Sequence, residues 1–352
     1  MIVLNMARWI TVIWFALLPI IATAHHSFAA RFDLEAINEL EGEVMSVRWR
    51  NPHVLFTLRA TDEQGQEMLY EMESSSLSMM RRMDVSADVL SVGDRVKVAG
   101  YPARRTANAM FVLNALLPSG QEIVFDPEGK PRWGESVGTT AVWQATQDDA
   151  VAEPTGIFRV WSTTLADPAT FPFPEIFDLT LVNNYPLTEG AKEALAAFNP
   201  VTDLPTLNCA PKGMPTIMEQ PYPMEIVDQG GIILLRLEEY DTLRTIHLGE
   251  SVAGADQPSS RLGYSIGHWE EATLVVRTTN LNWPHFDTVG IPLSDEAEIV
   301  ERFIPSDDGR RLDLRMTVTD PATFTEPVEL RKYWLALPGI QVQPYECLAS
   351  AL

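Results

Sequence analysis

Apolar and polar residues alternate along much of this chain, and a period of two is typical of strands with one buried face. The clearest example spans residues 311–319, where Leu, Met and Val occupy every second position between Arg, Asp and Thr. Turn residues separate such runs, for example Gly-Gly at 230–231 and Asp-Asp-Gly at 307–309. The pattern therefore predicts an all-β protein.

The part of the chain that follows residue 24 begins with a set of strands around one helix. The order strand, strand, strand, helix, strand, strand is that of an OB-fold, a small Greek-key barrel. We therefore expect an OB-like domain over residues 25–125. The alternating runs predict strands at residues 41–49, 53–60, 67–73, 94–100, 108–117 and 121–125, with a helix at 78–90.

The remainder predicts a second β domain over residues 156–352, joined by a Pro-, Gly- and Asp-containing linker at 126–155. About ten short strands favour an antiparallel barrel or sandwich, of which a lipocalin-like barrel is one form. Thr188 is a good N-cap for a helix that ends near Phe198.

The first 24 residues have the pattern of a signal peptide. Arg8 precedes an apolar run at residues 9–21, and Ala22-Thr23-Ala24 places small residues where signal peptidase cleaves. We expect an exported, periplasmic protein whose mature chain begins at His25 and has no stable membrane insertion. An uncleaved anchor is the alternative, although the run is shorter than the roughly 20 residues of a spanning helix.

The formal net charge of −22 narrows the class of partner. An acidic chain is repelled by nucleic acid phosphates and by anionic membranes. We therefore exclude nucleic acid as a partner, although OB-folds often bind it. The acidity favours solubility, and attraction to cationic partners is the alternative.

The chain has two cysteines, Cys209 and Cys347. Export places them in an oxidising compartment, where an even count predicts one disulfide. It would link the early part of the second domain to the end of the chain. Two buried free thiols are the alternative.

Three histidines form the candidate metal site. Cleavage before His25 gives this residue a free α-amino group beside its imidazole, a pair that chelates one metal ion. His53 or His26 supplies a third ligand, and the arrangement suits copper. Cleavage one residue earlier would give Ala-His-His, which also binds Cu(II). A solvated terminus and an ordinary strand-end histidine are the alternative.

Aromatic and ionisable residues of the second domain form a candidate pocket for a small molecule. An aromatic core with satisfied histidines is the alternative. The motif Gly-Tyr-Ser-Ile-Gly at 263–267 matches G-x-S-x-G, but the residues after it predict a strand, not the helix of a nucleophile elbow. The candidate lining residues are Tyr264, His268, Trp269, Trp283, His285 and Asp287.

Several motifs of the first domain carry a family resemblance. They are His-His-Ser-Phe at 25–28, Glu-Gly-Glu-Val at 41–44, Asn-Pro-His at 51–53 and the segment 93–100. With these motifs, the domain resembles a family of exported bacterial proteins known only as a domain of unknown function.

The second domain is similar to another uncharacterised bacterial β-rich family. The motifs are Pro-Tyr-Pro at 221–223, the segments 263–270 and 273–276, Asn-Trp-Pro at 282–284, Val-Glu-Arg-Phe at 300–303 and Tyr-Glu-Cys at 345–347. Relatives carry Glu-Gly-Asp where this chain has Glu-Glu-Ala at 270–272, which changes the expected turn.

Neither resemblance implies an activity, so the functional prediction rests on residues. We expect a periplasmic binding protein for a metal ion or small molecule, with copper held by the N-terminal histidines. One alternative is an enzyme, either a copper-dependent oxidase or a cofactorless barrel enzyme. A protein-interaction module is the other.

Overall fold

The computed structural model describes most of the chain after residue 30. The predicted signal peptide, His25 and His26 lie outside the described residues. No helix in the described part has the length and apolarity needed to span a bilayer. The described residues are 31–61, 65–152, 156–174, 184–199, 209–249 and 257–347, with 181, 202, 203 and 206.

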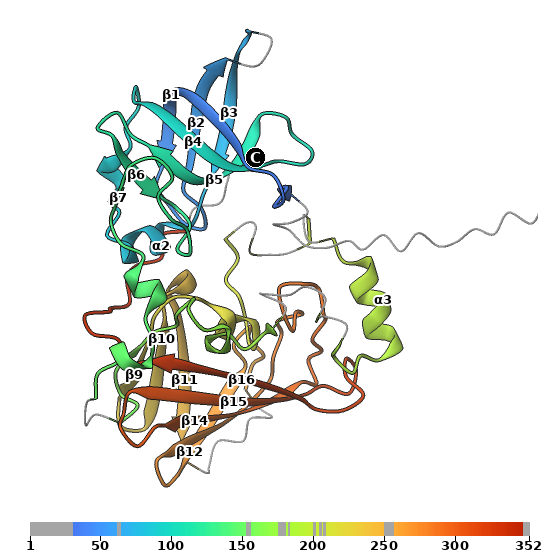
Figure 1. Cartoon of the computed structure of the whole chain (residues 1–352). Helices are drawn as coiled ribbons and strands as arrows, with labels where there is room; N and C mark the ends of the chain where they lie inside the picture. The colour runs from blue at the N-terminus through green and yellow to red at the C-terminus, as the bar shows by residue number, and fades with distance from the viewer. Residues whose placement is uncertain are drawn as a thin grey trace, which may run out of the picture.

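The first part of the chain forms a closed five-stranded barrel (Figure 1). The strand order is β3-β2-β1-β4-β5, and a parallel pairing of β3 with β5 closes it. This is the predicted OB topology, with helix α2 (Leu77–Arg82) between β3 and β4. The strands are β1 (Asn38–Arg48), β2 (Leu55–Thr61), β3 (Glu67–Glu73), β4 (Arg95–Pro102) and β5 (Ala109–Leu116).

A bulge at Leu113 of β5 lies opposite the Ala99–Gly100 step of β4. The register with β5 shifts between Ala99 and Gly100, where the two backbones approach closely. A Cβ atom at Gly100 would lie 2.0 Å from the carbonyl oxygen of Phe111. Only glycine fits at this point of the barrel wall.

The predicted helix at 78–90 is shorter in the structure. Ser76 caps α2 by accepting a hydrogen bond from the Met79 amide, and the helix ends at Arg82 with Met83 as its C-cap. Asp84 then has a φ of 56°, which breaks the helical path. The remainder forms the short helix η1 (Ala87–Val89), while Met80 and Met83 still point into the barrel core.

Residues 126–152, predicted as a linker, pack against both barrels. Strand β6 (Gln121–Val124) pairs with β5, and β7 (Glu135–Val137) pairs with β6 in parallel. The helices η2 (Ala141–Gln144) and η3 (Gln147–Asp149) follow. Trp143 is fully buried in the core of the first barrel. Ala145 and Ala150 pack instead on β16 of the second barrel.

The second part forms a nine-stranded, nearly closed barrel. Its order is β16-β15-β14-β13-β12-β11-β10-β9-β8, and two backbone hydrogen bonds between Ser162 and Leu335 link the first and last members. The strands are β8 (Val160–Trp161), β9 (Met224–Asp228), β10 (Ile232–Leu237), β11 (Thr242–Leu248), β12 (Tyr264–Glu270), β13 (Thr273–Thr279), β14 (Glu298–Pro305), β15 (Arg311–Thr319) and β16 (Val328–Leu335).

One strand pair departs from the predicted antiparallel arrangement. Strands β11 and β12 run parallel over a short register that pairs Ile246 with Ser265. The connection after β11 spans residues 249–263, so it crosses over instead of turning back as a hairpin.

Short helices complete the described portion of this part, and two of them reach its core, one of these through Ala191. Thr188 caps α3 as predicted, by accepting from the Ala191 amide. Ile217 and Met218 of η8 belong to the same buried core as the inward residues of the strands. The helices are η4 (Pro168–Thr170), α3 (Glu189–Ala197), η8 (Thr216–Glu219) and η9 (Glu239–Asp241).

Candidate metal centre

His53 lies just before β2, in the turn that follows Asn51 and Pro52. Its Nδ1 is 2.9 Å from the carbonyl oxygen of Ser74. Because a carbonyl oxygen only accepts, Nδ1 must carry the proton and donate it. The lone pair of Nε2 is then free to bind a metal ion, in the arrangement that metal-binding histidines usually have.

Glu73, at the end of β3, faces this free nitrogen. Its Oε1 is 3.6 Å from Nε2 of His53. Its Oε2 is 2.7 Å from Nη2 of Arg31. The His53 side chain is 41% exposed and that of Glu73 is 13% exposed, so a partly exposed imidazole lies beside a largely buried carboxylate. Imidazole nitrogen and carboxylate oxygen together suit a borderline divalent cation.

The N-terminal histidines precede this point by a few residues. Arg31, the first described residue, is tied to Glu73 and follows His25 by six positions. Six residues span at most roughly 20 Å, which is enough to reach His53. Within the described residues no group of three or more His, Cys, Asp or Glu side chains is arranged to hold a metal ion. Further ligands would have to come from other residues or solvent.

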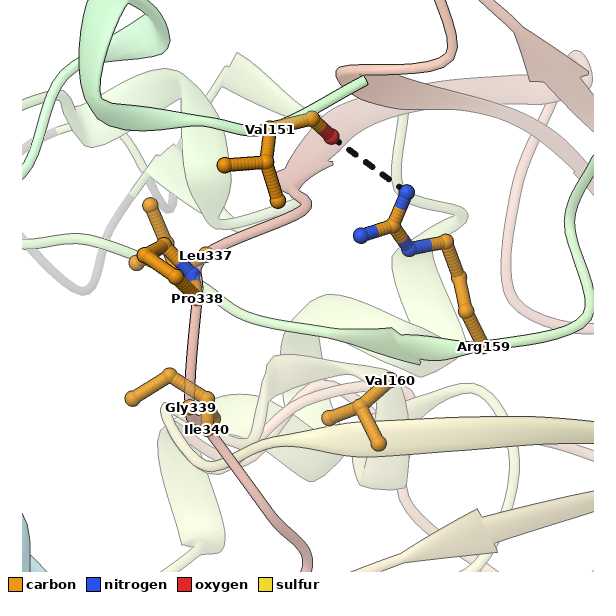
Figure 2. Close-up of a pocket in the computed structure, with 7 residues that line it drawn as sticks. All are labelled: Val151, Arg159, Val160, Leu337, Pro338, Gly339 and Ile340. Carbon is orange, nitrogen blue, oxygen red and sulfur yellow. Dashed lines mark hydrogen bonds between the residues drawn. The ribbon is translucent and has the colours of Figure 1, made fainter. Parts of the chain in front are cut away.

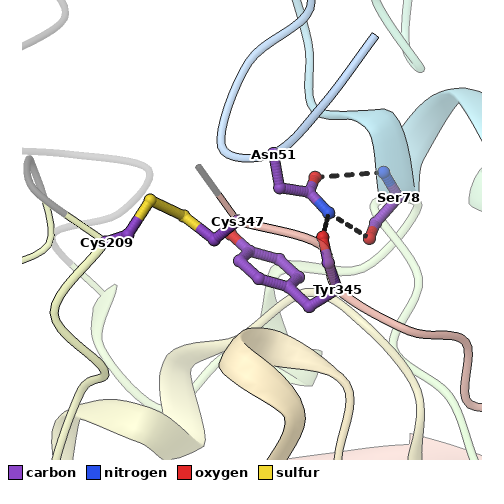
Figure 3. The surroundings of a disulfide bond; sticks show 5 residues. All are labelled: Asn51, Ser78, Cys209, Tyr345 and Cys347. Carbon is purple, nitrogen blue, oxygen red and sulfur yellow. Dashed lines mark hydrogen bonds between the residues drawn. A yellow bond between two sulfur atoms is a disulfide. The ribbon is translucent and has the colours of Figure 1, made fainter. Parts of the chain in front are cut away.

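The turn that carries His53 is also joined to the end of the chain (Figure 3). The fully buried Asn51 side chain donates from Nδ2 to the carbonyl of Tyr345 and to Oγ of Ser78, 3.1 Å away. Its Oδ1 accepts from the Ser78 amide at 3.2 Å. The predicted disulfide between Cys209 and Cys347 forms two residues beyond Tyr345.

Three predicted pocket residues lie on β12, largely at the surface. Tyr264 stacks on His247, with ring centroids 4.7 Å apart. The His268 side chain is 63% exposed and contacts Glu270 at 3.3 Å. Trp269 is partly exposed and packs edge-on against Phe158.

The other three lie together in the segment after β13. Trp283 donates to Oγ1 of Thr216 at 2.9 Å and packs against His285. Burial lowers the pKa of His285, so the imidazole is neutral at neutral pH. The Asp287 carboxylate accepts from the amides of residues 289–291, each at 3.0 Å. This group has the contacts of an aromatic core and a capped turn.

Ser265, the serine of the G-x-S-x-G match, lies within β12 and faces the barrel interior. It is 2% exposed and its Oγ contacts Thr278 and the guanidinium of Arg244. Arg244 in turn makes a bidentate ion pair with Glu301, and both side chains are buried. A residue in mid-strand without the strand–turn–helix geometry is not a nucleophile elbow.

The described residues also line two hollows at the surface. The larger, about 430 Å³, lies between residue 151, the start of β8 and residues 337–340 (Figure 2). Nη1 of Arg159 donates to the Val151 carbonyl at its edge, at 3.3 Å. The smaller, about 200 Å³, lies along the parallel β11–β12 pair and includes Tyr264. Tyr264 is the only one of the six predicted pocket residues in either lining.

Buried ionisable groups in the second barrel were missed by the sequence analysis. Lys212 lies 3.1 Å from Glu239 and 4.0 Å from Glu219, at the barrel end nearest η9. Burial opposes the charge of Lys212, but the two carboxylates raise its pKa above the ordinary value. Lys332, on β16, donates to the Met218 carbonyl at 2.8 Å, and burial lowers its pKa to about 7. The sequence did hold one signal for Lys332: it falls on the alternate positions of β16 that the apolar residues Val328, Leu330 and Trp334 occupy.

Comparison with known proteins bears on the first barrel. Residues 15–110 match the model of a family of unknown function (DUF6152). No curated protein and no solved structure matches the chain. The matched segment includes His25, His26, His53 and Glu73 and ends within β5. The second resemblance, for residues 156–352, stays a prediction.

Proposed function

We propose that this is an exported, periplasmic binding protein that holds a copper ion between His53 and the N-terminal histidines His25 and His26. The observation that carries the proposal is the hydrogen bond from Nδ1 of His53 to the Ser74 carbonyl. It fixes the tautomer and leaves Nε2 as a ligand before any metal arrives.

Charge and reach support the same site. Glu73 places a carboxylate beside Nε2 of His53, which favours a cation there. Its contact with Arg31 brings the chain to within six residues of His25. If signal cleavage frees the α-amino group of His25, that nitrogen and an imidazole chelate Cu(II), with His53 as the third ligand.

A small-molecule role for the second barrel has less support. Apolar inward residues of its strands and of η8 form one core, and the buried Arg244–Glu301 ion pair lies beside them, so side chains occupy the described interior. Of the six predicted pocket residues, Tyr264 alone lines either of the two hollows described above. We therefore place the binding role at the first barrel.

The test uses protein exported and processed in a bacterial host. Mass spectrometry identifies the first residue, and elemental analysis measures copper, nickel and zinc. We expect His25 at the terminus, near-stoichiometric copper, and at least about a 100-fold loss of Cu(II) affinity in His53→Ala.

His268→Ala is the matched control, because this histidine is more exposed than His53 and belongs to the other barrel. It should keep the wild-type affinity. Protein that is metal-free and takes up no added Cu(II) would reject the proposal. So would equal losses in the two variants.

A further inference from the structure

We infer that the C-terminal strap, residues 343–347, positions His53, and that the Cys209–Cys347 disulfide thereby sets the metal affinity of the site. The inference rests on the proposed metal-binding function. It concerns how that site is held, and it assigns a role to the only two cysteines of the chain.

The strap contacts the first barrel where the His53 turn begins. Asn51 is the main contact, through its side-chain bond to the Tyr345 carbonyl and a parallel bridge between its backbone and that of Cys347. Arg81 of α2 adds a hydrogen bond to the Pro344 carbonyl at 2.8 Å and an ion pair with Glu346 at 3.1 Å. The strap therefore lies against both the turn and α2.

The second barrel holds the other side of the strap. The Tyr345 amide donates to Oδ1 of Asp241 at 3.1 Å, and the Gln343 amide donates to Oε2 of Glu238 at 3.0 Å. The Tyr345 ring packs between Tyr222 and Tyr240, with centroids 5.7 and 4.9 Å away. The disulfide then fixes the end of the strap covalently (Figure 3).

His53 is clamped between two anchored neighbours. On one side, Asn51 is fixed by the strap and by Ser78. On the other, the Val54 amide donates to the Ser75 carbonyl at 3.0 Å, and the Ser74 amide donates to the Val54 carbonyl at 2.9 Å. If the strap leaves, the buried Asn51 amide loses a partner and one side of the clamp loosens.

Opening the disulfide has a defined chemistry. A dithiol reductant supplies two electrons and two protons, the S–S bond becomes two thiols, and the reductant becomes a disulfide. The strap is then held by non-covalent contacts alone. Residues that orient a metal ligand without touching the metal typically change affinity by about 10- to 100-fold when they are lost. We expect a loss of affinity in that range.

The experiment compares the processed wild-type protein with the Cys209→Ser/Cys347→Ser double variant. The double variant has no thiols, so no reductant is needed. Ni(II) is the probe because, unlike Cu(II), it would also leave the thiols of reduced wild-type protein unoxidised. The Kd of the double variant should rise by about 10- to 100-fold at a temperature where it stays folded. Glu301→Gln is the control, since it breaks a buried ion pair of the second barrel away from the strap. Its Kd should not change.

Amide hydrogen exchange tests the positioning without any metal. Exchange at Val54 and Ser74 should accelerate in the double variant and in wild-type protein whose disulfide has been reduced, while the amides of β4 and β5 keep their rates. If the double variant does not fold, Asn51→Ala removes the contact with the disulfide intact and should give the same two effects.

The outcomes separate the two proposals. If wild-type protein binds no Ni(II) or Cu(II), the metal function fails, whatever the exchange rates show. If it binds and the double variant binds equally well, the positioning role is overturned. Affinity that falls as far in Glu301→Gln as in the double variant would also overturn it, because global destabilisation would then explain the loss.

Discussion

At the scale of single residues, Lys332 gives the second barrel a dependence of stability on pH. Its side chain is 3% exposed and its pKa is lowered to about 7 by burial, with Glu219 opposing. In the unfolded chain a lysine has a pKa of about 10.4. Between these values the unfolded chain binds more protons, so the free energy of unfolding rises with pH. Below about pH 7 Lys332 is protonated in both the folded and the unfolded chain, so it no longer makes the free energy of unfolding depend on pH.

We expect Lys332→Met to remove that rise. Urea unfolding of both proteins should be measured between about pH 6 and 9. The free energy of unfolding of the variant should exceed that of the wild-type protein most at low pH. The advantage should shrink as pH increases above about 7, by about 3 kcal/mol by pH 9. The other titratable groups are common to both proteins and cancel in the difference. If the free energies of unfolding of the two proteins differ by the same amount at every pH, Lys332 keeps its ordinary pKa in the folded protein.

The residue scale also shows where sequence reasoning stopped. His53 could be chosen from the sequence because of its motif, but Glu73 could not, since only the fold brings the end of β3 to the turn before β2. Arg244 and Glu301 occupy inward-facing positions of β11 and β14. The alternation of residues along a strand does not by itself show whether a charged residue faces inward or outward. A buried charge is recognisable only when its partner on another strand is known.

At the scale of elements, local patterns predicted strands well and pairings less well. Strand β3 matches its expected bounds, because alternation and turn residues are local signals. The helix at 78–90 is cut short because Asp84 takes a positive φ, a choice set by the packing around Met83 and Val85. The consecutive strands β11 and β12 pair in parallel, and period-two patterning does not encode the relative direction of two paired strands.

Glu122 on β6 shows how one side chain can place an entire segment. Its carboxylate is fully buried and accepts from the amides of Arg132, Trp133 and Gly134, at 2.7 to 3.0 Å. These bonds hold the chain that leads into β7. Glu122→Gln replaces an acceptor by a donor facing other donors, and we expect a loss of about 2–3 kcal/mol in unfolding free energy.

Denaturant unfolding measures that loss, and faster amide exchange at Trp133 and Gly134 locates it. Glu135→Gln makes the same chemical change at an exposed position of β7, and it should alter stability by less than about 0.5 kcal/mol. Equal stability of the two variants would show that Glu122 does not hold the segment.

At the scale of the whole molecule, the segment predicted as a linker joins the barrels firmly. The ring of Trp143 belongs to the core of the first barrel, while its carbonyl accepts from the Leu165 amide at 2.9 Å. Tyr222 of the second part donates to Oγ of Ser76 at 2.9 Å. Pro and Gly content predicted a linker here because composition reports local preference and not the surfaces on either side.

Arg82, the last residue of α2, connects the three parts at one point. Its guanidinium lies 3.7 Å from the Trp143 ring and donates to the Pro221 carbonyl at 3.0 Å and to Oγ of Ser162 at 2.7 Å. Burial lowers its pKa only to about 10, so it stays charged at neutral pH. A cation held by a ring and two acceptors from the second part resists separation of the barrels.

We therefore expect the wild-type protein to unfold in a single calorimetric transition, with both barrels melting together. Arg82→Met should lower the unfolding free energy by about 2–4 kcal/mol, because it leaves buried acceptors unpaired. Arg81→Met, at the neighbouring residue whose ion pair with Glu346 is exposed, should cost less than about 1 kcal/mol. Two resolved transitions in the wild-type protein would show that the barrels are independent. In that case, strap and disulfide could not transmit the state of the second barrel to His53.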